Sequence, residues 1–321
     1  MFGRKYVAAF VGWDVVIPMA HAPSGAGGLS ALNITSGWFV AALATFTVGL
    51  AFATAAMCDW PRWRLVRRAV TLLLTQLMVL VTCGALINSR ARFFSTLGDL
   101  FGMGATDGHG AWVPAGTPTL APVASPAQRE RLAAWVAAAR RRSGPGRGVV
   151  APLVFAGGRT GHRLPALLYL PDAYFTSPPA GQRFPVLQLL AGYPGTVESW
   201  TRSIGLADAL DVQIAAGRLP ALIAVAAEQN PLRGRDSECV DGADGSRAET
   251  FLARDVPEIL LKHLPVAADR ADWALMGYST GGYCAVNLAL RNPHRYAVAI
   301  SLSGQFTPVS DRSTGDLYRG R

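Results

Sequence analysis

The stretch Trp273–Leu290, WALMGYSTGGYCAVNLAL, places a short apolar run, a glycine-rich turn and a helical segment around one serine. Its first four residues are apolar and bounded by polar ones, which is typical of a buried strand. Gly277, Ser279 and Gly281 then form a G-x-S-x-G pattern, and the Ala/Leu/Val-rich remainder is helical in character. Glycines at these positions permit a tight strand-to-helix turn that exposes the serine hydroxyl. The stretch therefore predicts a nucleophile elbow with Ser279 as the nucleophile; the alternative is a glycine-rich turn carrying an ordinary surface serine.

The partners of this serine are harder to find. A serine nucleophile needs a general base and an acid that orients the base, and after such an elbow the acid precedes the histidine in the chain. His294 is the only histidine after Ser279. It lies between the predicted elbow helix and the next apolar run, where the chain needs a polar turn whether or not the histidine is catalytic. Asp311 and Asp316 are the only acids that follow, in a polar tail without a predicted strand. The sequence thus predicts the nucleophile and leaves its partners unassigned.

The segment Leu189–Trp200, LLAGYPGTVESW, is the second candidate element. It follows a predicted buried strand, and its two glycines and its proline let the backbone turn with N–H groups exposed. In acyl transfer the developing oxyanion is bound by two such groups, one of them on the residue after the nucleophile and the other on a loop of this kind. We therefore predict Thr280 and Tyr193 as oxyanion donors; the alternative is a plain strand-to-helix loop.

Short apolar runs and helical stretches alternate in the second half of the chain. A hairpin followed by strand–helix alternation predicts an α/β fold, with a mainly parallel sheet and crossover connections. A helix with Ser125 as N-cap precedes the hairpin. The predicted hairpin strands are Val149–Phe155 and Leu164–Leu170, the later strands are Val186–Ala191, Ala221–Ala227 and Tyr296–Gly304, and the helices between them are Ile204–Ala216 and Glu249–His263.

Two uncharged or nearly uncharged apolar segments near the N-terminus, Ile34–Met57 and Ala69–Asn88, are long enough to cross a bilayer. The connection between them carries four arginines, so the positive-inside rule places it in the cytoplasm and everything after Asn88 outside. Tyr6–Ala22 is either a third span or a start signal, although it is short and contains Asp14. The alternative of two buried helices in a soluble core fits poorly, because both segments are apolar all round.

We accordingly predict a multi-pass cell-membrane protein with an extracytoplasmic catalytic domain. The predicted organisation is a membrane region at residues 1–101 with two or three transmembrane helices, a linker rich in Gly, Pro, Thr and Ala at residues 102–124, and the α/β domain at residues 125–321.

Composition and motif spacing argue against a nucleic-acid partner, a metal site and a bound cofactor. The formal net charge is +9, but no aromatic-and-basic stripe or recognition motif accompanies it, so no nucleic-acid partner is predicted. Histidine spacings match no metal site, and neither a phosphate loop nor a dinucleotide fingerprint is present, so no metal and no cofactor are expected. Cys239 and Cys284 lie in the predicted exported domain, where oxidation is allowed; they form either a disulfide or two separate thiols.

Five segments together resemble a known family. LLAGYPG followed by a tryptophan, RDSEC, AETFLARDVP, GYSTGGYCAVNLALRNP and SLSGQF, in this order, are similar to the putative-esterase family of α/β-hydrolases, which includes esterase D and the mycolyltransferases. The similarity runs roughly from Val149 to Tyr318 and is greatest to the membrane-anchored branch of high-GC bacteria. It implies an α/β-hydrolase fold and a serine nucleophile that hydrolyses esters, or transfers their acyl groups, on an ester or lipid-like substrate. By position Ser279 matches the nucleophile, and Thr280 and Tyr193 match the oxyanion donors.

The sequence departs from the family in two respects. Ala191 replaces the histidine or aspartate that many relatives carry before the loop glycine. The family's sheet has two more strands after Tyr296–Gly304, and its acid and histidine lie beyond Arg321, so we expect the chain to be C-terminally incomplete and Tyr296–Gly304 to be an open sheet edge. Under this expectation the chain is a fragment of a longer reading frame or a degenerate remnant. The alternative function is accordingly a catalytically inactive, truncated hydrolase-fold surface protein with a binding or structural role.

Overall fold

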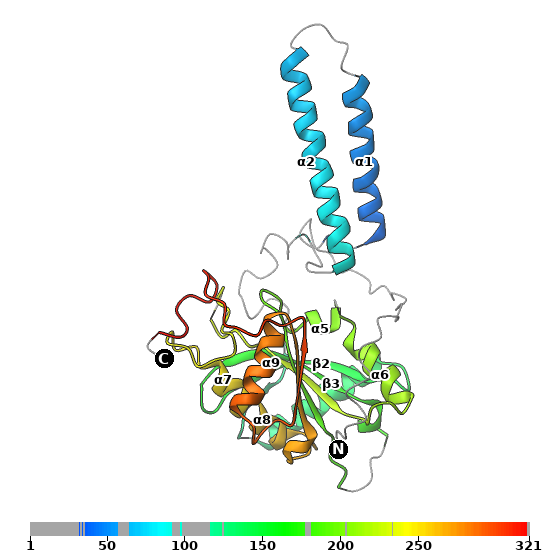
Figure 1. Ribbon diagram of the computed structural model, residues 1–321. Coiled ribbons are helices and arrows are strands. Elements are labelled where there is room, and N and C mark those ends of the chain that lie inside the picture. Colours follow the sequence, from blue (N-terminus) through cyan, green and yellow to red (C-terminus); the bar gives the residue numbers. More distant parts are fainter. Residues whose placement is uncertain are drawn as a thin grey trace. The chain divides into compact units, whose positions relative to one another are not determined.

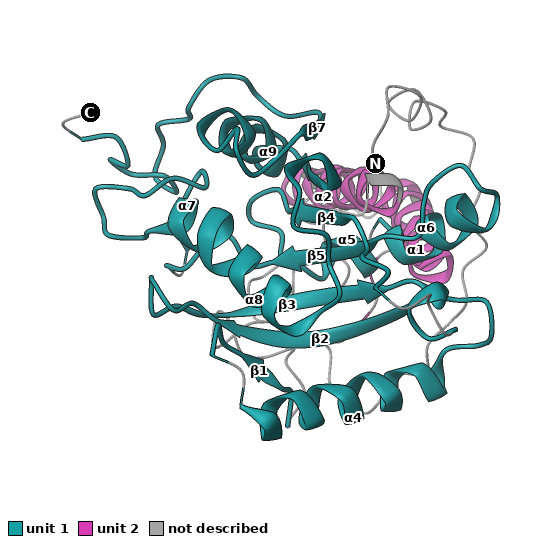
Figure 2. Cartoon of the chain, turned by 90° about the horizontal axis from the view of Figure 1, so that it is seen from below, with its two compact units in different colours: residues 1–18, 107–321 teal, residues 19–106 magenta. Residues whose placement is uncertain are grey.

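The chain divides into two units, residues 19–106 and residues 1–18 with 107–321, which Figure 2 shows in different colours. The computed structural model describes residues 32, 34, 36–56, 64–91, 97, 116–123, 125–176, 181–202, 204–232 and 234–319.

The first unit contains two helices that pack side by side, α1 (Gly37–Ala56) and α2 (Arg64–Ala91) (Figure 1). Each includes a run long and apolar enough to cross a membrane, and only 6% of either run is buried. Length and composition alone qualify them, and a signal sequence or a core helix would meet the same test. The two helices match the predicted apolar segments, whereas the third candidate, Tyr6–Ala22, lies outside the described residues.

Threonine hydroxyls join these two helices. Thr47 and Thr82 approach each other to 2.8 Å between their Oγ1 atoms, and Thr54 and Thr75 to 3.2 Å. Each of the four hydroxyls also contacts the carbonyl oxygen four residues earlier in its own helix. All four hydroxyls therefore find partners within the helix pair and need no water, which suits an apolar environment.

A seven-stranded, mostly parallel sheet forms the centre of the second unit, in the order β1-β2-β3-β5-β4-β6-β7. The hairpin strands β2 and β3 are antiparallel, β3 pairs antiparallel with β5, and β5, β4, β6 and β7 run parallel. This arrangement confirms the predicted α/β-hydrolase-like architecture. The strands are β1 (Thr119–Leu120), β2 (Val149–Ala156), β3 (Arg163–Leu170), β4 (Val186–Leu190), β5 (Ile223–Ala227), β6 (Trp273–Tyr278) and β7 (Val298–Leu302).

Helices cover both faces of this sheet (Figure 1). Apolar residues of α4, α8 and α9 form one buried cluster with the sheet, and those of α5 and α6 form the other. The predicted helix Glu249–His263 is confirmed, with a π-helical turn at Phe251–Asp255 between its two α-helical parts. The helices are α4 (Pro126–Arg142), α5 (Ser199–Arg202), α6 (Leu206–Ala215), α7 (Ala248–Thr250), α8 (Val256–His263) and α9 (Thr280–Arg291), and short 3-10 turns lie at Asp172–Tyr174 and Arg270–Asp272.

One expectation about the linker is wrong at its C-terminal end. Residues 102–124 read as a linker without periodicity, yet Thr119 and Leu120 form β1 and pair with Val154 and Phe155 of β2. Leu120 is fully buried beneath this edge of the sheet. A two-residue strand is too short to produce an alternating pattern, so the burial of one leucine among prolines and threonines leaves no periodic signal.

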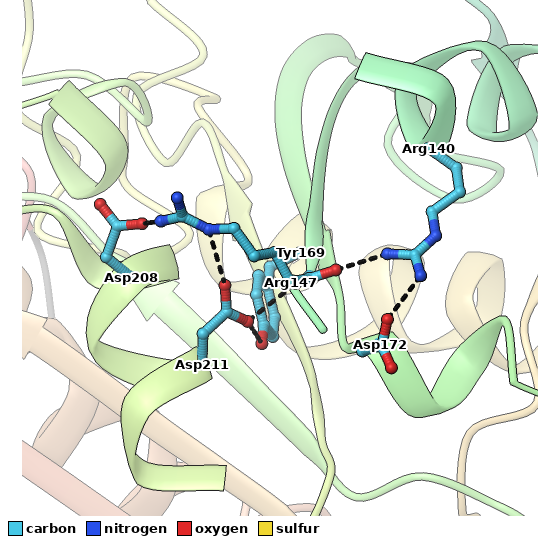
Figure 3. A network of polar contacts seen from close by, with 7 residues as sticks. Arg140, Arg147, Tyr169, Asp172, Asp208 and Asp211 are labelled. Atoms are coloured by element: carbon cyan, nitrogen blue, oxygen red, sulfur yellow. Dashed lines mark hydrogen bonds and ion pairs between the residues drawn. The ribbon is translucent and has the colours of Figure 1, made fainter. Parts of the chain in front are cut away.

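A polar network fixes α4 and α6 to the hairpin (Figure 3). Asp211 accepts hydrogen bonds from the Tyr169 hydroxyl at 2.7 Å and from the Gly148 N–H at 2.8 Å. Burial and the neighbouring Asp211 carboxylate raise the pKa of Tyr169, so this phenol stays a neutral donor. The network therefore satisfies the polar groups where β2 begins. Its ion pairs join Arg147 to Asp208 and Asp211, and Arg140 to Asp172.

Candidate active site

The predicted elbow is present between β6 and α9. Ser279 lies between the two elements with a φ of 53°, a value that is rare for residues other than glycine. Its N–H donates to the Leu302 carbonyl at 3.0 Å, which ties the turn to the end of β7. Strain of this kind is typically held in place by the surrounding structure at functional sites. Ser279 therefore stands at the carboxyl end of β6, a parallel strand flanked by β4 and β7, and open α/β sheets bind ligands at this end of their strands.

Both elbow glycines are required by close backbone contacts. A Cβ atom on Gly277 would lie 1.9 Å from the Gly281 carbonyl oxygen, and one on Gly281 would lie 2.2 Å from the Leu190 oxygen. Real Cβ atoms do not approach other atoms so closely, and the atoms in the way belong to the backbone. The turn is therefore possible only with glycine at these two positions.

The loop after β4 reaches the elbow as expected. A Cβ on Gly192 would lie 2.8 Å from the Ser279 Cβ, so the loop backbone passes directly against the serine. Tyr278 packs against the loop: a Cβ on Gly195 would lie 2.8 Å from its hydroxyl oxygen, and one on Gly192 would lie 2.8 Å from its ring. The ring of Trp200 packs edge-on against Tyr278 at 5.3 Å between centroids. Tyr278, the residue before the serine, therefore packs against both the loop and Trp200 of α5.

The two predicted oxyanion donors lie beside each other, but one of them is occupied. The Tyr193 N–H donates to Thr280 Oγ1 at 2.7 Å. Within the part of the chain that the structure describes, no hydrogen bond reaches the Ser279 hydroxyl. The nucleophile is thus free while the Tyr193 donor is engaged within the protein.

The loop after β5 is fastened to both of these elements. Cys239 and Cys284 form a disulfide, with 5.5 Å between their Cα atoms, so the alternative of two separate thiols is wrong. The bond joins this loop to α9 and is fully buried. In addition, the Gln229 side-chain amide donates to the Ala191 carbonyl at 2.9 Å, next to the loop after β4. The β5 loop therefore forms one wall of the elbow region.

Three acids of this loop, Glu228, Asp236 and Glu238, are buried. Glu228 accepts the N–H groups of the next two residues, and burial raises its pKa to about 7. Burial, and secondarily the charges of Glu238 and Asp311, raise the pKa of Asp236 to about 6. Glu238 accepts the Val309 N–H at 2.6 Å and the Tyr318 hydroxyl at 2.5 Å, which holds the C-terminal segment on the loop. No sequence signal separates such acids from surface ones, because their burial depends on distant segments.

The described histidines do not complete a triad. His294 follows the twelve-residue helix α9 and so lies about 18 Å along the chain's helical path from Ser279. It contacts Arg254 at 2.8 Å. The downstream acids are engaged elsewhere: Asp311 caps its own turn, where bonds from Ser313 lower its pKa, and Asp316 pairs with Arg319. The geometry therefore argues against His294 as the base. The other described histidines contact backbone carbonyls, His162 that of Ser246 and His263 that of Ala121.

Residues 157–313 match the model of a family described as putative esterase. This segment is esterase-like, as its motifs predicted. An uncharacterized protein of Corynebacterium glutamicum is 32% identical over 147 residues, which cover 45% of this chain and 33% of the relative. The MPT51 antigen of Mycobacterium leprae is 38% identical over 78 residues, which cover 24% of this chain and 25% of the relative. The chain thus matches a third or less of the length of these curated relatives.

Solved structures similar to the esterase-like segment include two hydrolases. A ferulic acid esterase is 22% identical with a TM-score of 0.48, and the match covers 54% of this chain and 67% of that chain. An S-formylglutathione hydrolase from Agrobacterium tumefaciens is 17% identical with a TM-score of 0.40, covering 49% of this chain and 58% of that chain. Likenesses at this distance carry no detail of the site.

Proposed function

We propose that this protein is a serine esterase or acyltransferase whose nucleophile is Ser279. The hydroxyl oxygen attacks the carbonyl carbon of an ester, the alcohol leaves with a proton, and an acyl-serine forms. Water then releases the acid, or a second alcohol takes the acyl group and yields a new ester. The observation that carries the proposal is the strained serine at the end of β6, against which the loop after β4 packs and whose hydroxyl forms no hydrogen bond with any described residue.

In this proposal the oxyanion of each tetrahedral intermediate is bound by backbone N–H groups of Thr280 and Tyr193. The support is their position: Thr280 follows the nucleophile at the start of α9, and Tyr193 lies within hydrogen-bond distance of the Thr280 side chain. Loss of one such donor typically lowers turnover by about a hundred- to a thousandfold. The general base remains unassigned, so the rival function is an inert domain that keeps the hydrolase fold for binding.

A fluorophosphonate probe separates the two functions. We expect the wild-type chain to be labelled on the peptide that contains Ser279, and Ser279→Ala to lose all labelling while it retains its circular dichroism spectrum. Ser143→Ala, at the C-cap of α4, is the matched control and should be labelled like the wild type. A folded wild-type chain without label at Ser279 would favour the inert domain.

We further propose that α1 and α2 cross the cell membrane and that the hydrolase domain lies outside the cytoplasm. The support is the length and apolar character of both helices, the threonine contacts that join them, and the four arginines of residues 62–68, at and just before the start of α2. Positive charges of short loops stay in the cytoplasm. The membrane would then be a permanent partner of the protein.

Cysteine accessibility tests this topology in a background without Cys58 and Cys83. Ala216→Cys, at an exposed position after α6, should react with an impermeant maleimide on intact cells. Pro61→Cys, in the arginine-rich connection, should react only after the cells are permeabilised. The opposite pattern would show an inverted orientation, and reaction of both on intact cells would rule out a membrane hairpin.

A further inference from the structure

Gln76 is a polar side chain on the exposed side of the apolar helix α2. It lies within the apolar run Ala69–Ser89, three residues before the middle residue Val79 and so about 4.5 Å from the middle along the helix axis. In the proposed membrane orientation the hydrocarbon core is about 30 Å thick, so the side chain lies well inside it. An amide without a hydrogen-bond partner is costly at that depth, because no water is present.

The structure shows no partner for this amide. Gln76 is exposed, and no hydrogen bond joins its side chain to any residue that the structure describes. The threonines on the other side of α2 behave differently, since Thr75 and Thr82 each contact a threonine of α1 and a carbonyl oxygen of their own helix. The helix pair therefore satisfies the polar groups between its helices and leaves Gln76 to a partner outside the pair.

Gln76 belongs to a face of α2 that points away from α1. Residues on this face recur at alternating spacings of four and three, the repeat by which two helices pack along their length. Its large members are strongly exposed, Leu73 by 65%, Leu80 by 69% and Ile87 by 62%. Smaller or polar residues alternate with them. The Gln76 face consists of Ala69, Leu73, Gln76, Leu80, Cys83 and Ile87, all of them exposed.

We propose that the Gln76 face binds the same face of a second copy of this chain, so that α2 pairs with α2 in a symmetric homodimer. The inference rests on the proposed membrane crossing. Copies that insert by the same charge rule run parallel, so a two-fold axis brings Gln76 of each copy to the same depth. A primary amide both donates and accepts, so the two glutamines can bond each other. One polar pair in an otherwise apolar contact also fixes the register of the two helices.

The native Cys83 lies on the same face, seven residues after Gln76, and provides the test. The purified full-length chain with Cys58→Ala is reconstituted in liposomes at a high lipid-to-protein ratio, so a second copy is the only protein partner present. Copper phenanthroline should link Cys83 of the two copies and move the chain from 34.0 kDa to twice that mass on a non-reducing gel. Reductant should reverse the shift.

Adjacent positions provide a matched pair of variants in a background that also carries Cys83→Ala. Leu80→Cys should link as Cys83 does, because Leu80 is on the Gln76 face. Val81→Cys should not, although Val81 is also exposed, because it points about 100° away around the helix. Equal linking of the two variants would indicate random collision, and an absence of any link at Cys83 and Leu80→Cys would exclude this dimer.

Gln76→Leu tests the amide itself. Fluorescence energy transfer between labelled copies, followed as lipid is added, should show the association constant falling by about three- to thirtyfold, the range for one interhelical hydrogen bond. Gln76→Asn keeps an amide and should lose less. Association of Gln76→Leu equal to the wild type would overturn the role of the glutamine.

Two further outcomes would overturn the proposal in different ways. If Val15→Cys links to Cys83 within one chain, without doubling the mass, the segment Tyr6–Ala22 covers the Gln76 face in place of a second copy. If the maleimide pattern at Ala216→Cys and Pro61→Cys rules out a membrane hairpin, the proposed topology fails and the dimer fails with it. A correct maleimide pattern without linking at Cys83 would remove the dimer alone and leave the topology standing.

Discussion

Replacing Gly281 with alanine should destabilise the hydrolase domain by about 3 kcal/mol or more and abolish labelling of Ser279. The added Cβ would lie 2.2 Å from the Leu190 oxygen and 2.5 Å from the Ala191 oxygen. Both oxygens belong to the chain leaving β4, a strand flanked by β5 and β6, so they cannot shift without moving the centre of the sheet. Urea denaturation followed by tryptophan fluorescence measures the loss.

Gly144→Ala is the matched control for this substitution. Gly144 lies just after α4, its φ is negative, and no atom lies within 4 Å of the Cβ that alanine would add. Its free energy of unfolding should equal that of the wild type or exceed it by a few tenths of a kcal/mol, because alanine restricts the unfolded chain. A Gly281→Ala variant as stable as Gly144→Ala would contradict the close packing of the elbow on β4.

The contrast between these glycines shows which parts of the site can be predicted from sequence. Gly281 is constrained by a turn whose strand, serine and helix are contiguous in the chain, so a local pattern is enough to identify it. The hairpin of β2 and β3 is equally local, and its register follows from two apolar runs separated by a short polar turn. Such features depend on residues close in sequence, so a local sequence pattern is enough to predict them.

The remaining features depend on contacts between distant segments. Strand order is one example, because β5 inserts between β3 and β4 although β4 precedes it in the chain. The contact of Tyr193 with Thr280 spans 87 residues, and the buried Glu238 binds Tyr318 across 80. Neither the hydrogen bond of the Tyr193 N–H nor the burial of acids such as Glu238 leaves a periodic pattern in the sequence. Even the four threonines between α1 and α2 read as ordinary members of apolar helices until the helices are paired.

The disulfide between Cys239 and Cys284 is also a contact between distant segments, and its removal should strongly lower the free energy of unfolding of the hydrolase domain. The double variant Cys239→Ala, Cys284→Ala should lose about 4 kcal/mol of unfolding free energy, the value that the chain-entropy model gives for closing a loop of 45 residues. Denaturant titrations of the wild type and the double variant, with and without reductant, measure this loss. Reductant should destabilise the wild type to the same level and leave the double variant unchanged.

Cys83→Ala provides the control, because Cys83 is a free, exposed cysteine on α2. Its substitution should change neither the stability of the hydrolase domain nor the response of that domain to reductant.

Removal of the disulfide should also affect the candidate active site. The disulfide holds the loop after β5 to α9, and α9 begins at Thr280, whose hydroxyl accepts the Tyr193 N–H. In the double variant, Tyr193 should therefore exchange its amide proton faster under conditions in which the domain is still folded. Full protection of Tyr193 there would show that the loop holds its position without the disulfide, through contacts such as Gln229 with Ala191 and Glu238 with Val309.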